Sequence, residues 1–89
     1  MVSKPNEHTE YISIKYESTS SSGKTHTYLV RAKRDGAVLG AIKWYASWRQ
    51  YVLFPYPNTI FNSGCMIAIT EFCEDINDKH KKMLDGHDG

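Results

Sequence analysis

The chain has 89 residues, which fit one domain, and its 40% hydrophobic and 24% charged residues are typical of a folded globular protein rather than a disordered one. No apolar run approaches the roughly 20 residues of a membrane-spanning helix, so we expect no membrane contact. The net charge of +1 is uneven, because residues 1–62 carry +4 and residues 63–89 carry −3. This asymmetry bears on the choice of partner and not on the fold.

The first predicted element follows a polar segment. Residues 1–9 contain little that is apolar, so we expect a flexible tail there rather than a secretory signal. Residues 11–16 alternate, with Ile12 and Ile14 on one side, which is typical of a half-buried strand. The residues from 18 to 24 are rich in Ser, Thr and Gly and predict a loop.

Two further alternating runs flank an Asp-Gly pair. Residues 26–33 and 38–45 alternate, and Asp35-Gly36 between them predicts a hairpin with a type I′ turn, in which both central residues have a positive φ. Residues 49–54 predict another strand, which two following prolines end.

The last element is predicted to be a helix over residues 63 to about 84. Asn62 or Ser63 suits its N-cap, and a stripe of apolar residues follows at helical spacing, among them Cys65, Met66 and Ile69. The fold class is therefore α+β, an antiparallel meander of three to four strands packed on one face by a single C-terminal helix (β-β-β-β-α). We expect one domain over residues 10–84 and a frayed C-terminus over 85–89.

Alternation divides the strand residues between two faces of the predicted sheet. The face toward the helix is predicted to hold Ile12, Ile14, Val30, Ile42, Trp44, Val52 and Phe54. The opposite face is predicted to show Tyr11, Lys15, Leu29, Arg31, Lys33, Lys43, Tyr45, Arg49, Tyr51 and Leu53. Trp48 lies in a turn, where we expect it to be buried as a lid on the core rather than exposed as an anchor.

The segment Gly40-Ala41-Ile42-Lys43-Trp44-Tyr45 … Trp48-Arg49-Gln50-Tyr51, followed by Pro55, Thr59-Ile60-Phe61 and Cys65, is distinctive. It resembles a group of small uncharacterised proteins encoded by bacteriophages and bacterial genomes, over roughly residues 38–76. The resemblance implies a prokaryotic or phage context and a compact domain. It implies no particular activity.

The sequence offers little for catalysis or for binding a metal or cofactor. The four histidines and two cysteines have no metal-ligand spacing, so we expect neither a metal nor a cofactor. Cys65, in the first turn of the helix, is the one candidate nucleophile, and its alternative role is that of a small core residue. Cys65 and Cys73 would lie about 12 Å apart along the helix, too far for a disulfide, which indicates reduced thiols in a cytoplasmic protein.

The remaining feature is the basic and aromatic outer face of the sheet. We interpret the chain as a small non-enzymatic binding module of prokaryotic or phage origin, with a protein partner or a second copy of itself on this face. The alternative is single-stranded nucleic acid, with bases stacked on the rings and phosphates on the basic residues. The candidate binding surface is Arg31, Lys33, Lys43, Tyr45, Trp48, Arg49 and Tyr51.

Overall fold

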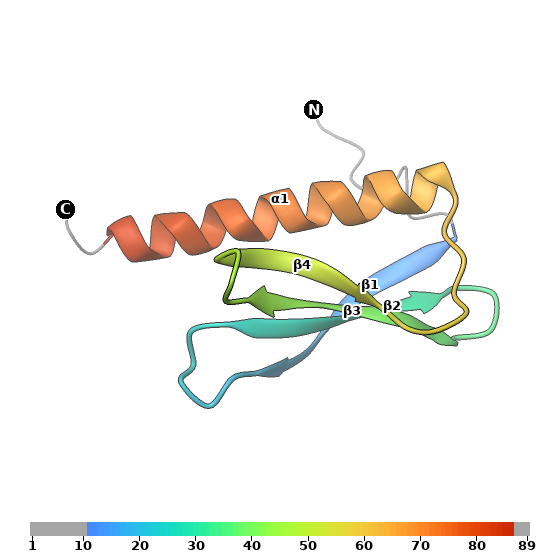
Figure 1. The fold of residues 1–89 in the computed structure, drawn as a ribbon, viewed down its shortest axis with the longest axis horizontal. Coiled ribbons are helices and arrows are strands. Elements are labelled where there is room, and N and C mark those ends of the chain that lie inside the picture. Colours follow the sequence, from blue (N-terminus) through green and yellow to red (C-terminus); the bar gives the residue numbers. More distant parts are fainter. Residues whose placement is uncertain (1–10, 87–89) are drawn as a thin grey trace.

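The computed structural model describes residues 11–86, and these form one antiparallel sheet and one helix. The strands β1 (Ile12–Thr19), β2 (His26–Ala32), β3 (Val38–Tyr45) and β4 (Gln50–Pro55) pair in the order β1-β2-β3-β4. The helix α1 (Ser63–Gly86) follows them and lies along one face of the sheet (Figure 1). The predicted α+β fold is confirmed.

The two ends of the chain fall outside this description. The tail predicted over residues 1–9 lies outside the described residues, as do residues 87–89 of the C-terminal segment.

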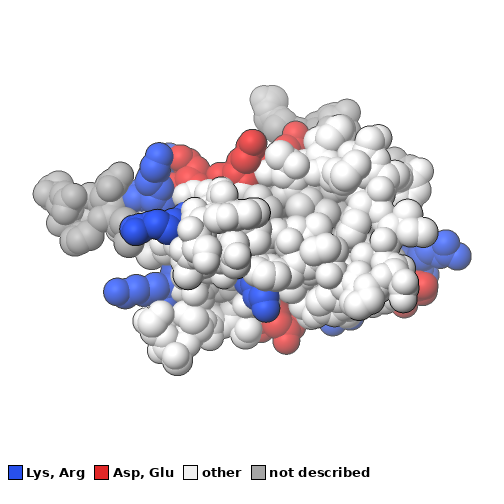
Figure 2. Space-filling model, viewed as in Figure 1, with Lys and Arg blue, Asp and Glu red and all other residues white. Residues whose placement is uncertain are grey.

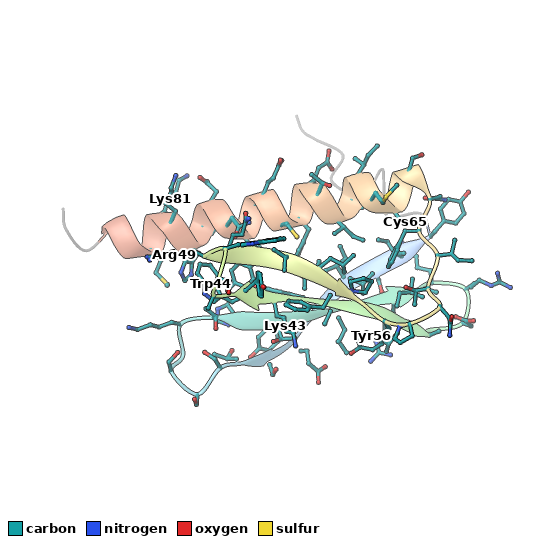
Figure 3. All side chains as sticks on the ribbon, in the orientation of Figure 1. Lys43, Trp44, Arg49, Tyr56, Cys65 and Lys81 are labelled. Atoms are coloured by element: carbon teal, nitrogen blue, oxygen red, sulfur yellow. The ribbon has the colours of Figure 1, made fainter. Side chains whose placement is uncertain are left out.

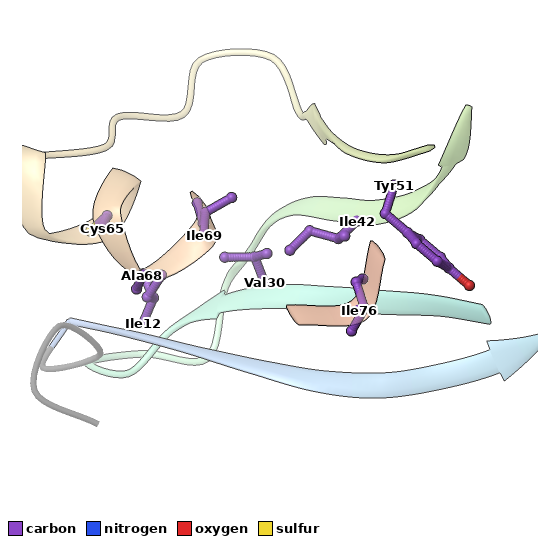
Figure 4. Packing of buried hydrophobic residues seen from close by; sticks show 8 residues of the cluster. All are labelled: Ile12, Val30, Ile42, Tyr51, Cys65, Ala68, Ile69 and Ile76. Atoms are coloured by element: carbon purple, nitrogen blue, oxygen red, sulfur yellow. The ribbon is translucent and has the colours of Figure 1, made fainter. Parts of the chain in front are cut away.

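The core lies between the sheet and α1 (Figure 4). Ile12, Val30 and Ile42 on three neighbouring strands are fully buried and contact the helical residues of the core. Burial of side chains of this size contributes about 1.5–3 kcal/mol each, which makes this layer the main source of stability. The helix supplies Cys65, Ala68, Ile69 and Ile76.

The start of α1 is fixed by a side chain. Asn62 Oδ1 accepts a hydrogen bond of 2.8 Å from the Cys65 amide, which otherwise has no partner in the helix. This confirms Asn62 as the N-cap. The apolar stripe of the helix was predicted to include Met66, but 53% of Met66 is exposed. The residues that face the sheet in this part of α1 are Cys65, Ala68 and Ile69.

The hairpin between β2 and β3 forms as predicted, with a different turn. The chain connects the strands over residues 33–37, and the Gly36 amide donates to the Ala32 carbonyl oxygen at 2.8 Å. Gly36 has φ of 76°, whereas Asp35 has no positive φ and instead accepts a hydrogen bond from the Ala37 amide through its carboxylate. The prediction of a two-residue type I′ turn was therefore wrong, because the Asp35 side chain stabilises a longer turn.

The helix also contacts one edge of the sheet. The Tyr51 amide on β4 donates to Asn77 Oδ1 at 2.7 Å, and Asn77 Nδ2 lies 3.5 Å from the Tyr51 carbonyl oxygen. Because β4 is an edge strand, these backbone groups would otherwise be free to pair with another chain. Asn77 thus joins α1 to β4 and occupies part of that edge.

Candidate functional site

The face of the sheet that points away from α1 is the candidate functional site. Directly opposed residues of neighbouring strands point to the same face, so the register defines which side chains gather there. One row in register crosses all four strands as Lys15, Leu29, Ala41 and Phe54. Together with its neighbouring rows it forms the outer sheet face, which we define as Lys15, Leu29, Arg31, Ala41, Lys43, Tyr45, Val52 and Phe54, with Trp48 in the turn after β3.

The two faces of β4 are the reverse of those predicted, so the side chains expected outside face the core. Tyr51 is 3% exposed and belongs to the core, and Leu53 packs against the same core. Val52 lies opposite Lys43 and Phe54 lies opposite Ala41, so both belong to the outer face. Tyr51 is therefore removed from the candidate binding surface, and Phe54 joins it.

The length of the turn between β3 and β4 explains this reversal. Tyr45 pairs with Gln50, and the four residues between them form the turn, in which the Trp48 and Arg49 amides donate to the Tyr45 carbonyl oxygen at 3.1 and 2.9 Å. Arg49 adopts a left-handed conformation with φ of 56°, so it ends the turn and is not part of the strand as predicted. The resulting register places Tyr51 opposite Trp44, on the core side.

The other predicted surface residues divide between the face and its rim. Lys43 and Tyr45 lie on the outer face, and Arg31, which pairs with Ser13, lies there too. Lys33 is exposed in the turn after β2. Trp48 was predicted to be buried, but 62% of it is exposed, because the turn holds it outside the core.

Ring contacts organise the part of the outer face near Trp48. Figure 3 shows Lys43 of this face on the side of the sheet away from α1. The Tyr45 ring packs edge to face against Trp48, with ring centroids 5.0 Å apart, and against Phe54 at 6.0 Å. Lys43 Nζ lies 4.7 Å from the centroid of the Phe54 ring, a cation–π contact of about 0.5–1 kcal/mol at an exposed site. These contacts fix an apolar centre with a cation over it.

Charge is distributed differently over the two layers. The strands carry the basic residues Lys15, Arg31 and Lys43 and one acidic residue, Glu17, which lies at the bulge between Tyr16 and Ser18. The exposed side of α1 carries Glu71, Glu74, Asp75 and Asp78. Figure 2 shows these acidic groups gathered along the helix edge of the molecule. The outer sheet face is therefore basic, whereas α1 is acidic between Glu71 and Asp78 and basic at Lys79, Lys81 and Lys82.

We expect the fluorescence of Trp48 to report an exposed indole. In the variant Trp44→Phe, Trp48 is the only tryptophan, and iodide should quench its emission strongly because most of the ring is in water. The matched variant Trp48→Phe leaves Trp44, which packs against Tyr51 and His80 and should be quenched far less. Equal quenching of the two variants would contradict the exposed position of Trp48.

Neither cysteine has the surroundings of a nucleophile. Cys65 is 4% exposed and packs within the core, which is the role of a small hydrophobic residue. Burial, and next the neighbouring Glu74, raise the pKa of the Cys73 thiol from 9.0 to about 11. A thiol with so high a pKa is almost entirely protonated near neutral pH and reacts slowly.

Alkylation of Cys73 is therefore expected to be slow in the folded protein at neutral pH and to accelerate as the pH approaches 11. Because folding raises this pKa, the thiol's contribution to stability is complete below pH 9 and is lost as the pH rises toward 11. Iodoacetamide labelling followed by mass spectrometry measures the rate, with protein unfolded in urea as the control. Rapid labelling of the folded protein at neutral pH would show that Cys73 is not buried as described.

The helix α1, the one helix of the described residues, is not long and apolar enough to span a membrane. Over residues 11–86 no group of three His, Cys, Asp or Glu side chains is placed to hold a metal ion.

Comparisons with protein families, with curated proteins and with solved structures gave no match. The resemblance of residues 38–76 to small phage and bacterial proteins therefore stays a prediction.

Proposed function

We propose that the chain is a small non-enzymatic binding module that holds a protein partner on its outer sheet face. The observation that carries this proposal is a sheet face that no element of residues 11–86 covers, with an apolar centre and basic residues around it. Leu29, Val52 and Phe54, which are partly exposed, provide the apolar centre around the buried Ala41, and Trp48 stands beside it with 62% of its surface exposed. Tryptophan, tyrosine and arginine are the residues that most often dominate the affinity of protein interfaces.

The charge of this face indicates the chemistry of the partner. Lys15, Arg31 and Lys43 surround the apolar centre, and Glu17 is the only acidic residue in the four strands. A complementary surface has apolar side chains at its centre and Asp or Glu around them. We therefore propose a partner segment that combines acidic and large apolar side chains.

A second copy of the chain suits this face less well. Two outer sheet faces brought together would place three basic residues of each copy against those of the other. Packing the basic face onto the acidic helix surface of another copy would be a head-to-tail contact, which continues into an open chain unless its rotation closes. A different protein with acidic residues would pair with Lys15, Arg31 and Lys43 without repulsion between basic faces and without forming an open chain of copies.

Single-stranded nucleic acid also suits the face less well than the sequence predicted. Stacking of bases needs free ring faces. Tyr51 is buried, Lys43 covers Phe54, and the Tyr45 and Trp48 planes stand at 86° to each other, so they offer no continuous platform. The basic residues remain, and the test below therefore includes an oligonucleotide.

The experiment is a selection from a library of short random peptides displayed on phage, with the purified protein as target. We expect enrichment of peptides that contain Asp or Glu together with aromatic or aliphatic residues. Trp48→Ala should weaken binding of the selected peptides about thirtyfold, the effect of a 2 kcal/mol hot spot. Lys43→Glu should also weaken it, whereas Lys81→Glu on the exposed helix surface is the matched control and should have no effect.

Three outcomes would contradict the proposal. One is the absence of enrichment, and another is equal binding of the selected peptides to wild type, Trp48→Ala and Lys43→Glu. The third is tight binding of an oligothymidine that falls steeply with salt and is lost in Lys43→Glu, since counterion release gives nucleic-acid binding that dependence. That third result would replace the protein partner with single-stranded nucleic acid.

A further inference from the structure

A second candidate site lies on the other side of the sheet, between the β1–β2 end and the C-terminal half of α1. It is a hollow of about 200 Å³. The helix contributes residues at positions 76, 79, 80 and 83, a spacing that puts them on one face. The lining consists of Lys24, His26, Tyr28, Tyr51, Ile76, Lys79, His80 and Met83.

The walls of the hollow are aromatic and in mutual contact. Tyr28 lies 6.4 Å from Tyr51 and 6.4 Å from His26 between ring centroids, in edge-to-face arrangements. His80 lies 6.1 Å from Tyr51 and packs on Trp44 at 4.4 Å. Connected rings of this kind hold their positions, so the hollow has a defined apolar wall suited to a flat group.

The phenols at the hollow can donate hydrogen bonds, whereas the role of the His26 ring depends on its tautomer. His26 Nδ1 lies 3.0 Å from Thr19 Oγ1, which leaves its other ring nitrogen for a ligand. The Tyr51 hydroxyl oxygen accepts from the His26 amide at 3.0 Å, so its own hydrogen can be donated elsewhere. Burial, and next Tyr51, raise the pKa of Tyr28, so this phenol also keeps its hydrogen at neutral pH.

The charge at the hollow is positive. Lys24 and Lys79 line it and no Asp or Glu does, although Lys79 pairs with Asp75 at 3.1 Å. Both partners of this pair are largely exposed, at 73% and 58%, and an exposed pair contributes little. The Lys79 ammonium can therefore turn to a bound anion at small cost.

The loop that carries Lys24 does not offer backbone amides to an anion. Its sequence Ser22-Gly23-Lys24-Thr25 ends like a phosphate-binding loop, but its amides are already used: Gly23 donates to Ser20, Lys24 to Ser22 and Thr25 to Ser20. The side chain of Lys24, and not the loop backbone, is therefore what this segment offers to a ligand.

We propose that this hollow binds a small anion composed of one flat ring and one phosphate or carboxylate group. The ring lies against the aromatic wall, and the anionic group lies between Lys24 and Lys79 with the imidazoles as further donors. The size is consistent, because a cavity of about 150 Å³ accepts a benzene ring and the hollow is somewhat larger. This site is independent of the outer sheet face, so either can be correct without the other.

The test is a titration of the whole chain followed by NMR of the histidine and tyrosine ring signals at constant ionic strength. The probes are phenyl phosphate, benzoate, phenol and inorganic phosphate. We expect saturable shifts of His26, His80 and Tyr28 with phenyl phosphate or benzoate in the millimolar range or below. The stronger of these two probes identifies the anionic group. Phenol and inorganic phosphate should each bind at least about tenfold more weakly, because each lacks one half of the ligand.

Matched variants separate a site from general attraction to a lysine-bearing surface. The double variant Lys24→Gln, Lys79→Gln should bind the better probe about tenfold more weakly, the effect of losing charge-assisted hydrogen bonds. The control is Lys33→Gln, Lys82→Gln, because Lys82 pairs with Asp78 on the helix as Lys79 pairs with Asp75. Shifts that do not saturate, shifts equal for phenol and phenyl phosphate, or equal weakening in both double variants would overturn the proposal.

Discussion

Replacing Tyr51 with alanine is expected to lower the free energy of unfolding by about 3–5 kcal/mol, the cost of removing a large aromatic side chain from a core. Tyr51 is 3% exposed, and its ring contacts Trp44 at 5.3 Å and Tyr28 at 6.4 Å between centroids. A domain of this size has a total stability of roughly 5–10 kcal/mol, so the variant should be marginally folded. Urea unfolding followed by circular dichroism measures the change.

Two further variants make this prediction specific. Tyr51→Phe keeps the ring and removes the oxygen that accepts from the His26 amide, which should cost about 1 kcal/mol. Phe54→Ala removes a ring from the outer sheet face, where burial is incomplete, and should cost less than half as much as Tyr51→Ala. A larger cost for Phe54→Ala than for Tyr51→Ala would mean that β4 faces the other way.

Replacing Gly40 with alanine is the second large destabilisation we expect, at about 1–3 kcal/mol, as for other overpacked core positions. A Cβ atom at Gly40 would lie 2.8 Å from the Phe54 carbonyl oxygen and 3.1 Å from the Pro55 Cα. Both are backbone atoms of β4, so the strand itself would have to move. Gly40 is also paired with Val30 on β2, which prevents β3 from shifting the other way.

The control for this prediction is Gly64→Ala in the first turn of α1. There the nearest atom to the new Cβ would be Asn62 Oδ1 at 3.4 Å, and alanine in place of glycine in a helix gains about 0.5–1 kcal/mol. Thermal unfolding of both variants should therefore give shifts of opposite sign, or at least a clear loss only for Gly40→Ala. Equal melting temperatures for the two variants would show that β3 and β4 are not as close as described.

Much of the fold could be predicted from the sequence because its signals are local. Alternation identified all four strands, and apolar residues at helical spacing identified the helix, with its N-cap narrowed to Asn62 or Ser63, of which Asn62 is the cap. The order of strands follows from short connections, which leave few choices other than a meander.

The orientation of β4 could not be predicted in the same way. Tyr51 and Leu53 alternate with Val52 and Phe54, so both faces of the strand are apolar and alternation cannot choose between them. The choice depends on the number of residues in the turn, and a one-residue difference moves every side chain to the other face. Arg49 ends the turn in a left-handed conformation and so sets the number of turn residues. Glycine is the usual sequence signal for this conformation, and none is present here.

The hollow beside α1 was missed for a different reason. Lys24 and His26 lie more than 50 residues from Lys79 and His80 in the sequence, and no spacing rule connects them. Only the placement of the helix over the end of the sheet brings the four side chains to one place.

The binding of a protein segment to the outer sheet face is tested most directly by ¹⁵N-labelled protein titrated with a peptide from the selection. The predicted result is a set of saturable shifts at Lys43, Tyr45, Val52 and Phe54 and at the indole N–H of Trp48, with little change along the exposed side of α1. The contradicting result is a set of shifts confined to α1 or to the hollow beside it, with the outer sheet face unchanged at saturation.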